Sequence, residues 1–427
     1  MTLTITLIVL LVLFLINVPI SFALIASSSI YFLTSDSFSG AVLIQRMVGG
    51  IESVPLLAII FFITAGILMN YTGITNRMLN FAQVITRPLP GGLAQVNVIL
   101  STMMGGLSGS NIADAAMQSK VLVPEMVKRG YPKSFSTVLT AASSLITPII
   151  PPGIALIMYG YVGNVSVGKL FLAGIVPGIV LCLVMMLYVH FVAKKQNFET
   201  DKKERVTGGE FFRSFKDAIL AILLPVIIIG GIRFGIFSAT EAGAIAVLYA
   251  LLLGLLIYRE MKPKHLLDAL VETVHTSASI LIIMAAGSAF AWILTIEQVP
   301  QTLTQFMVGI ISSPEMFFVV VLLFLLIVGM FVEGNVALII LTPLFMPMLQ
   351  AYGIDPVHFG IFFIMCLSIG TLTPPLGTIM FTTCSITGTK IEEFAKESLP
   401  FLALLIIAAL VIAFVPSISL WLPSELF

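Results

Sequence analysis

Charged residues are scarce in this chain. Asp, Glu, Lys and Arg make up 10% of the 427 residues, whereas 59% are hydrophobic and the mean hydropathy is +1.11. This balance excludes a water-soluble globular domain, because too few polar side chains are present to cover its surface. Backbone in lipid must satisfy its own hydrogen bonds, and the period-2 alternation of a membrane β-barrel is missing. The sequence therefore predicts an all-α polytopic membrane protein.

Residue types that carry redox, metal or nucleotide chemistry are few and scattered. The three cysteines lie in apolar segments, where we interpret them as buried thiols without a disulfide framework or metal site. The four histidines show no metal-binding spacing, and we recognise no constellation of a nucleophile with a base and no metal cluster. GNVSVGKL imitates a phosphate-binding loop, but Leu170 stands where Ser or Thr is needed. We therefore predict no nucleotide cofactor and no enzyme activity, so any energy the protein uses comes from an ion gradient or a partner.

One polar loop, residues 194–217, carries seven of the 21 basic residues. The positive-inside rule places this loop in the cytoplasm. It also divides the chain into two parts, residues 1–193 and 218–427. Pro19 interrupts the first apolar stretch and favours two short helices there, because proline removes a helix hydrogen bond.

Prolines recur at corresponding positions of these two parts. A single constant offset in residue number places Pro124, Pro151, Pro152 and Pro177 on Pro347, Pro374, Pro375 and Pro400. Paired apolar segments interrupted by Gly and Pro are typical of a transporter's binding site. We predict an inverted-repeat transporter with re-entrant hairpins at about 93–127 and 315–350 and broken helices at about 134–161 and 358–384. The repeats would be inverted because the charge pattern places residues 128–133 inside and the corresponding residues 353–356 outside.

The predicted hairpin tips are rich in oxygen atoms that can bind a cation. Residues 108–111 are SGSN and residues 333–335 are EGN. Small side chains, free backbone carbonyls and an amide oxygen suit a hard cation such as sodium. The prolines of the broken helices would free further carbonyls at residues 147–150 and 370–373. The half-helices that begin at Pro152 and Pro375 would present positive dipole ends to an anionic substrate.

Amphipathic stretches flank each hairpin, for example residues 74–85 and 299–310. Such helices can lie in the membrane interface. They would either join a moving core to a fixed frame or serve as ordinary interfacial connectors.

The sequences MGGLSGSNIADA, IIPPGIALIMYG and GTLTPPLGTIMF resemble the large membrane subunit of tripartite ATP-independent periplasmic (TRAP) transporters. The resemblance covers essentially the whole chain and is strongest toward the sialic-acid branch. It implies an elevator-type, sodium-coupled secondary active importer of an organic acid, favoured here as N-acetylneuraminate, in the bacterial inner membrane. It also implies two partners, a small four-helix membrane subunit and a periplasmic substrate-binding protein. The alternative is a proton-coupled or binding-protein-independent organic anion symporter.

The resemblance further implies which residues form the site. Two or more sodium ions would be held by the hairpin tips and the two helix breaks, at Ser108, Ser110, Asn111, Pro148, Ile150, Gly334, Asn335, Gly370, Thr371 and Thr373. The substrate would contact Asn111, Pro152, Gly153, Glu333, Asn335 and Pro375. Glu333 departs from the Ser-Asn-Thr tips of related symporters, which leaves the ligands of the second tip open. We also expect Asp114 near the site.

Overall fold

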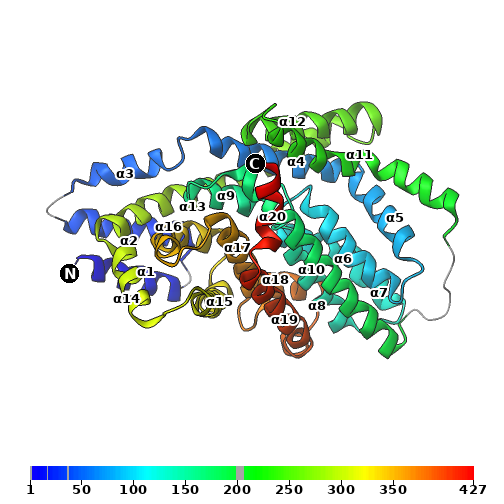
Figure 1. Ribbon diagram of the computed structural model, residues 1–427. Helices are drawn as coiled ribbons and strands as arrows, with labels where there is room; N and C mark the ends of the chain where they lie inside the picture. The colour runs from blue at the N-terminus through cyan, green and yellow to red at the C-terminus, as the bar shows by residue number, and fades with distance from the viewer. Residues whose placement is uncertain (1, 17, 36–37, 199–205) are drawn as a thin grey trace.

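The fold is all-helical, as the composition predicts. The computed structural model describes residues 2–16, 18–35, 38–198 and 206–427, and within these ranges all regular secondary structure is helical (Figure 1). Eight of the described helices are long and apolar enough to cross a membrane.

The helices follow one another through short connections. Those before residue 199 are α1 (Thr2–Leu15), α2 (Ile20–Thr34), α3 (Gly40–Gly49), α4 (Val54–Tyr71), α5 (Ile74–Thr86), α6 (Gly92–Gly105), α7 (Asn111–Lys128), α8 (Lys133–Ser143), η1 (Ser144–Ile146), α9 (Ile154–Val162) and α10 (Val167–Gln196). Those after residue 205 are α11 (Gly208–Arg233), α12 (Ala239–Leu252), η2 (Leu253–Ile257), α13 (Pro263–Ile296), α14 (Val299–Ile310), α15 (Pro314–Phe331), α16 (Gly334–Tyr352), α17 (Pro356–Leu372), α18 (Thr378–Thr387), α19 (Ile391–Phe414) and α20 (Ser417–Leu426). The first apolar stretch thus forms two short helices, α1 and α2, as Pro19 predicts.

Helices extend into the predicted loop 194–217 from both sides. The helix α10 continues through Gln196, and α11 begins at Gly208. Thr207 and Glu210 form a capping box, in which the N–H of Glu210 donates to Thr207 Oγ1 at 3.3 Å and the N–H of Thr207 donates to Glu210 Oε2 at 3.2 Å. This reciprocal cap starts α11 early because it satisfies two N–H groups at the helix end. Residues 199–205 of the predicted loop lie outside the described residues.

The structure contains two helical hairpins and two broken helices. The hairpins are α6–α7 and α15–α16, and the breaks lie between η1 and α9 and between α17 and α18. The offset that relates the prolines also relates the first residues of α7 and α16, and the glycines that follow these helices, Gly130 and Gly353, both have positive φ. The Pro151–Pro152 and Pro374–Pro375 bonds are both cis. The assignment of domain boundaries and of opposite membrane orientation stays a prediction.

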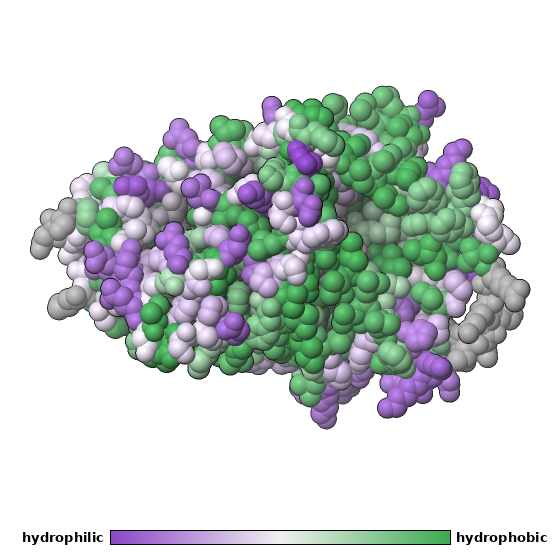
Figure 2. All heavy atoms as spheres, in the orientation of Figure 1, coloured by the Kyte–Doolittle hydropathy of each residue, from purple (hydrophilic) through white to green (hydrophobic). Residues whose placement is uncertain are grey.

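The helix α17 is enclosed by the helices around it. Every residue from Val357 to Leu372 is buried, and the helix is apolar on all sides, as expected of a segment enclosed by protein. It packs against α15, α16, α10 and α19. Helices at the periphery instead expose apolar faces, such as Leu183, Leu187 and Phe191 on α10. Figure 2 shows apolar side chains over much of one face of the molecule, which suits contact with lipid.

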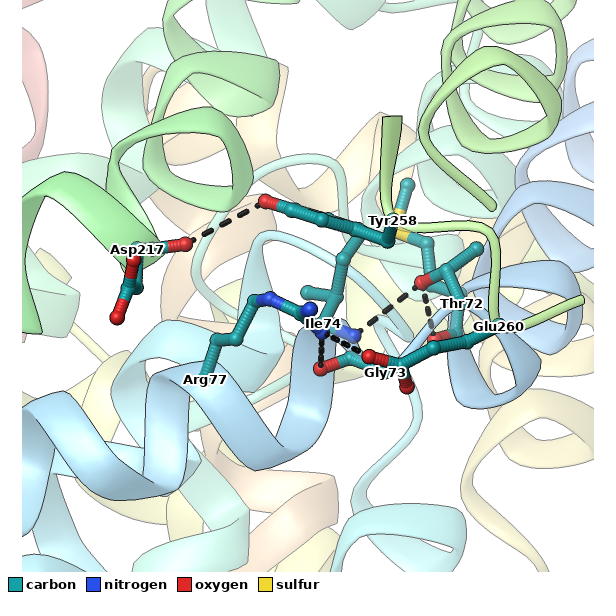
Figure 3. Close-up of polar contacts among 8 residues, drawn as sticks. Thr72, Gly73, Ile74, Arg77, Asp217, Tyr258 and Glu260 are labelled. Atoms are coloured by element: carbon teal, nitrogen blue, oxygen red, sulfur yellow. Dashed lines mark hydrogen bonds and ion pairs between the residues drawn. The ribbon is translucent and has the colours of Figure 1, made fainter. Parts of the chain in front are cut away.

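A cluster around Arg77 fixes the joint between α4 and α5 (Figure 3). The Arg77 guanidinium donates to the carbonyl oxygen of Gly73 at 3.0 Å and lies 2.7 Å from a carboxylate oxygen of Glu260. Its Cζ lies 3.8 Å from the centre of the Tyr258 ring, and the Tyr258 hydroxyl donates to the carbonyl oxygen of Asp217 on α11 at 3.4 Å. One cation thus ties the start of α5 to the segment after η2, and Tyr258 ties that segment to α11.

Removing this cation should loosen the joint. We expect Arg77→Ala to lower the free energy of unfolding by about 1–2 kcal/mol, because a cation–π contact and a partly buried ion pair are lost together. Arg77→Lys should be intermediate, since lysine keeps the charge but not the planar group over the ring. The measurement is the apparent melting temperature of the purified protein. Lys128→Ala, which removes an exposed ion pair with Glu125 at 3.8 Å, is the control and should change little. If Arg77→Ala has the same apparent melting temperature as Lys128→Ala, the cluster around Arg77 does not stabilise this joint.

Candidate functional site

Both hairpin tips face one cavity of about 1120 Å³. The first tip contributes residues 108–111, and the second contributes residues 333–335. Pro148 and Thr371, from the two helix breaks, also line the cavity. Segments from opposite sides of the loop 194–217, far apart in the chain, therefore meet around a single space.

The first tip is held tightly against the first break. Gly109 has a φ of +59°, and a Cβ at this position would lie 2.8 Å from the carbonyl oxygen of Pro152 and 3.1 Å from Gly153 Cα. Only glycine fits both the backbone conformation and this close approach. The next residue, Ser110, is the N-cap of α7, and its hydroxyl accepts from the N–H of Ala113 at 3.4 Å. Asn111 Oδ1 accepts from the N–H of Ile112 at 2.9 Å.

The second tip uses Glu333 where the first uses Ser110. Glu333 is the N-cap of α16, and its carboxylate accepts from the N–H groups of Asn335 at 3.1 Å and Val336 at 3.2 Å. It also accepts from Asn335 Nδ2 at 2.8 Å. The offset that relates the prolines aligns Glu333 with Ser110, so both caps occupy the same position of their hairpins. A carboxylate is well placed there because the start of a helix carries partial positive charge.

A substitution series separates the capping role of Glu333 from its charge. We expect Glu333→Ala to cost about 1 kcal/mol of stability, as other lost N-caps do. Glu333→Ser should recover most of this loss, because serine caps α7 at the corresponding position. Apparent melting temperatures of the three proteins provide the comparison. Equal melting of the serine and alanine variants would show that capping is not what Glu333 contributes.

The helix breaks leave backbone carbonyls without the N–H partners that a continuous helix would supply. Residues 147–153 form no helix, and a side chain at Gly153 would collide with the carbonyl oxygen of Pro148. A side chain at Gly377 would collide with the carbonyl oxygen of Thr371 and would lie 2.9 Å from that of Thr373. The prolines of each break supply no N–H to these oxygens, which leaves them able to bind other groups.

The cavity brings together part of the predicted site. The predicted residues that line it are Ser108, Ser110, Asn111, Pro148, Glu333, Gly334, Asn335 and Thr371. Those that the structure places outside its lining are Ile150, Pro152, Gly153, Gly370, Thr373 and Pro375. Packing accounts for most of the second group: the Ile150 side chain fits against Gly105, Pro152 and Gly153 lie behind Gly109, and Gly370 lies against Gly329.

Asp114 lies behind the first tip and outside the cavity lining. Its carboxylate is 1% exposed and accepts from Gln118 Nε2 at 2.7 Å and from Thr147 Oγ1 at 3.0 Å. Gln118 Nε2 also donates to Ser101 Oγ at 2.7 Å. These bonds connect α7 to α6 and to the first break. Asp114 therefore supports the site and does not face it.

Several polar residues of the cavity were missed at the level of sequence. Asn70 on α4, Ser368 on α17, and Glu272, Thr276 and Ser279 on α13 all line it. Glu272, Thr276 and Ser279 are four and three residues apart, so they lie on one face of a helix. This spacing was the signal in the sequence that could have identified them. Their position at the cavity depends on tertiary packing.

Comparison with known proteins identifies the family. Residues 7–418 match the family described as the tripartite ATP-independent periplasmic transporter, DctM component. The chain is 38% identical to the sialic acid TRAP transporter large permease protein of Vibrio cholerae over 96% of both chains. It is 36% identical to the 2,3-diketo-L-gulonate TRAP transporter large permease protein of Escherichia coli over 94% of both.

A solved structure shows the same fold. The crystal structure of the YdaH transporter of Alcanivorax borkumensis matches with a TM-score of 0.63 at 14% identity, covering 96% of this chain and 98% of that one. The family and the apolar helices make this a multi-pass protein of the bacterial inner membrane and a transporter component, not an enzyme. The chain belongs to the DctM family, the large permeases of TRAP transporters of organic acids.

Proposed function

We propose that this permease couples the entry of sodium to the import of an organic acid, with N-acetylneuraminate as the favoured substrate. The observation that carries the proposal is the convergence of both hairpin tips and both helix breaks on one cavity. The similarity to a sialic acid permease supports the choice of substrate.

Two sets of oxygen atoms suit sodium. The first comprises Ser108, Ser110 and Asn111 with the carbonyl of Pro148, and the second comprises Asn335 with Thr371. Hydroxyl, amide and carbonyl oxygens are the ligands that hard cations prefer. Asn335 Nδ2 is already bonded to Glu333, which leaves the amide oxygen of Asn335 for a cation.

The substrate's carboxylate would bind at the first tip. Both α7 and α16 begin at the cavity, and helix N-termini favour anions. The start of α16 already holds the carboxylate of Glu333, which would repel a second carboxylate. The start of α7 is capped by the neutral Ser110, and the carboxylate in its first turn, Asp114, is buried behind the tip and does not line the cavity, so the substrate's carboxylate would meet no carboxylate at the cavity wall there.

We infer that α5 and α14 act as arms of an elevator-type movement. The helix α5 packs against α6 of the first hairpin and against α11, and α14 packs against α16 of the second hairpin and against α13. Each amphipathic helix thus bridges a hairpin and a membrane-spanning helix, which favours arms over simple connectors.

Transport requires reconstitution with both expected partners, the small membrane subunit and the loaded periplasmic binding protein. We expect radiolabelled N-acetylneuraminate to accumulate in such proteoliposomes under an inward sodium gradient. Replacing sodium with potassium at fixed pH should abolish accumulation. Undiminished uptake without sodium would reject the coupling, and uptake driven by a proton gradient alone would favour the proton-coupled alternative.

A further inference from the structure

The helix α13 contributes three polar side chains to the wall of the cavity that the hairpin tips also line. Glu272, Thr276 and Ser279 line the cavity, followed one turn later by Ile283. Their spacing of four, three and four residues places all of them on one face of the helix.

The three polar side chains that α13 contributes are exposed where they line the cavity, and two other faces of α13 have different surroundings. Leu267, Leu270, Val271 and Val274 lie on the opposite face and are 48–65% exposed, as apolar side chains in contact with lipid would be. Ala269, Thr273 and Ser277 lie on a third face that is buried in protein. A carboxylate directed at lipid would be costly. Glu272 avoids this cost because it faces the cavity.

Glu272 lacks a compensating cation in the part of the chain that the structure describes, where the ion pairs involve other residues. The Tyr71 phenol lies beside it, and Asn70 lines the cavity nearby. Ser279 donates its own proton to the carbonyl oxygen of His275 at 2.9 Å, which leaves its oxygen free to accept. An ionised carboxylate accepts hydrogen bonds only, so this wall attracts hydroxyl donors and repels anions.

We propose that Glu272, Thr276 and Ser279 form a second subsite that binds the hydroxyl groups of a polyhydroxylated acid and excludes a second carboxylate. The inference rests on the proposed function, in which the substrate's carboxylate lies at the hairpin tips. A cavity of about 1120 Å³ has room for a substrate that reaches from the tips to α13. Glu272 then sets specificity, because a dicarboxylate spanning the same space would bring its second charge to this residue.

Equilibrium binding to the purified complex of this chain with its small subunit tests the subsite without the selectivity of the binding protein. The probes are N-acetylneuraminate and succinate, titrated in sodium buffer. The wild-type complex should prefer N-acetylneuraminate. Glu272→Gln and Thr276→Val should each weaken its binding by about ten-fold, the usual effect of losing a good hydrogen bond, and leave succinate unchanged or tighter. The control is His275→Gln, since His275 is exposed on the same helix but does not line the cavity.

The ratio of the two affinities decides the result. The proposed subsite is rejected if the wild-type complex does not prefer N-acetylneuraminate to succinate. It is also rejected if the ratio of the two affinities is unchanged in both variants. Thr276→Val is judged by itself if Glu272→Gln fails to fold. Binding of N-acetylneuraminate that does not depend on sodium would contradict the proposed coupling but not the subsite, provided that the variants still shift the ratio.

Discussion

Asn335→Ala is expected to raise the sodium concentration that half-saturates uptake by about ten-fold, as the loss of one good ligand to a charged group should. The amide of Asn335 has its nitrogen bonded to Glu333, so its oxygen is the atom that the substitution removes from the proposed second sodium site. Asn111→Ala should act in the same direction at the first site. Its effect should be smaller, because Asn111 Oδ1 already accepts from the N–H of Ile112.

The measurement is initial uptake in proteoliposomes as a function of external sodium. Asn80→Ala is the matched control, since Asn80 is exposed on α5 and lies away from the cavity. Wild-type sodium dependence in both the Asn111 and Asn335 variants would reject these residues as ligands.

Gly370→Ala is expected to cost about 1–3 kcal/mol of stability through overpacking. A Cβ at Gly370 would lie 2.6 Å from Gly329 Cα and 3.0 Å from the carbonyl oxygen of Leu326, so α15 and α17 would have to separate. Backbone atoms cannot rotate out of the way as a side chain can. Both the yield of folded protein and its apparent melting temperature should fall.

Gly309→Ala provides the control for this substitution. Gly309 lies in α14, and a Cβ there would meet nothing within 4 Å. If Gly370→Ala melts like Gly309→Ala, the close approach of α15 and α17 is not needed for stability.

The sequence was most informative where proline and glycine dictate the backbone. The proline pairs Pro151–Pro152 and Pro374–Pro375 lie at helix breaks, because each pair removes two successive N–H donors. Single prolines such as Pro124 and Pro347 instead lie inside continuous helices. The recurrence of these breaks at a constant offset, together with the polar tips, was enough to predict the hairpins and broken helices. The all-helical fold follows from the low charge and high hydropathy together with the absence of period-2 alternation.

Side-chain roles that depend on differences of a few ångströms in position could not be predicted from the sequence. Glu333 seemed to break the symmetry of the two tips, whereas the structure gives it the capping role of Ser110 with a longer side chain. Ile150 and Gly370 stay predicted carbonyl ligands; the structure adds that they pack against other glycines and lie outside the cavity lining. The contribution of α13 was missed: the spacing of Glu272, Thr276 and Ser279 marks one face of a helix but does not indicate that this face lines the cavity.

The coupling of ion and substrate movement is the central claim, and the ratio of their fluxes tests it most directly. Radiolabelled sodium and N-acetylneuraminate are followed together in proteoliposomes that contain this chain, its small subunit and the loaded binding protein. We predict that two or more sodium ions enter with each substrate molecule. Omitting either sodium or the substrate should slow the flux of the other. Substrate accumulation with no sodium entry above the substrate-free background would contradict it.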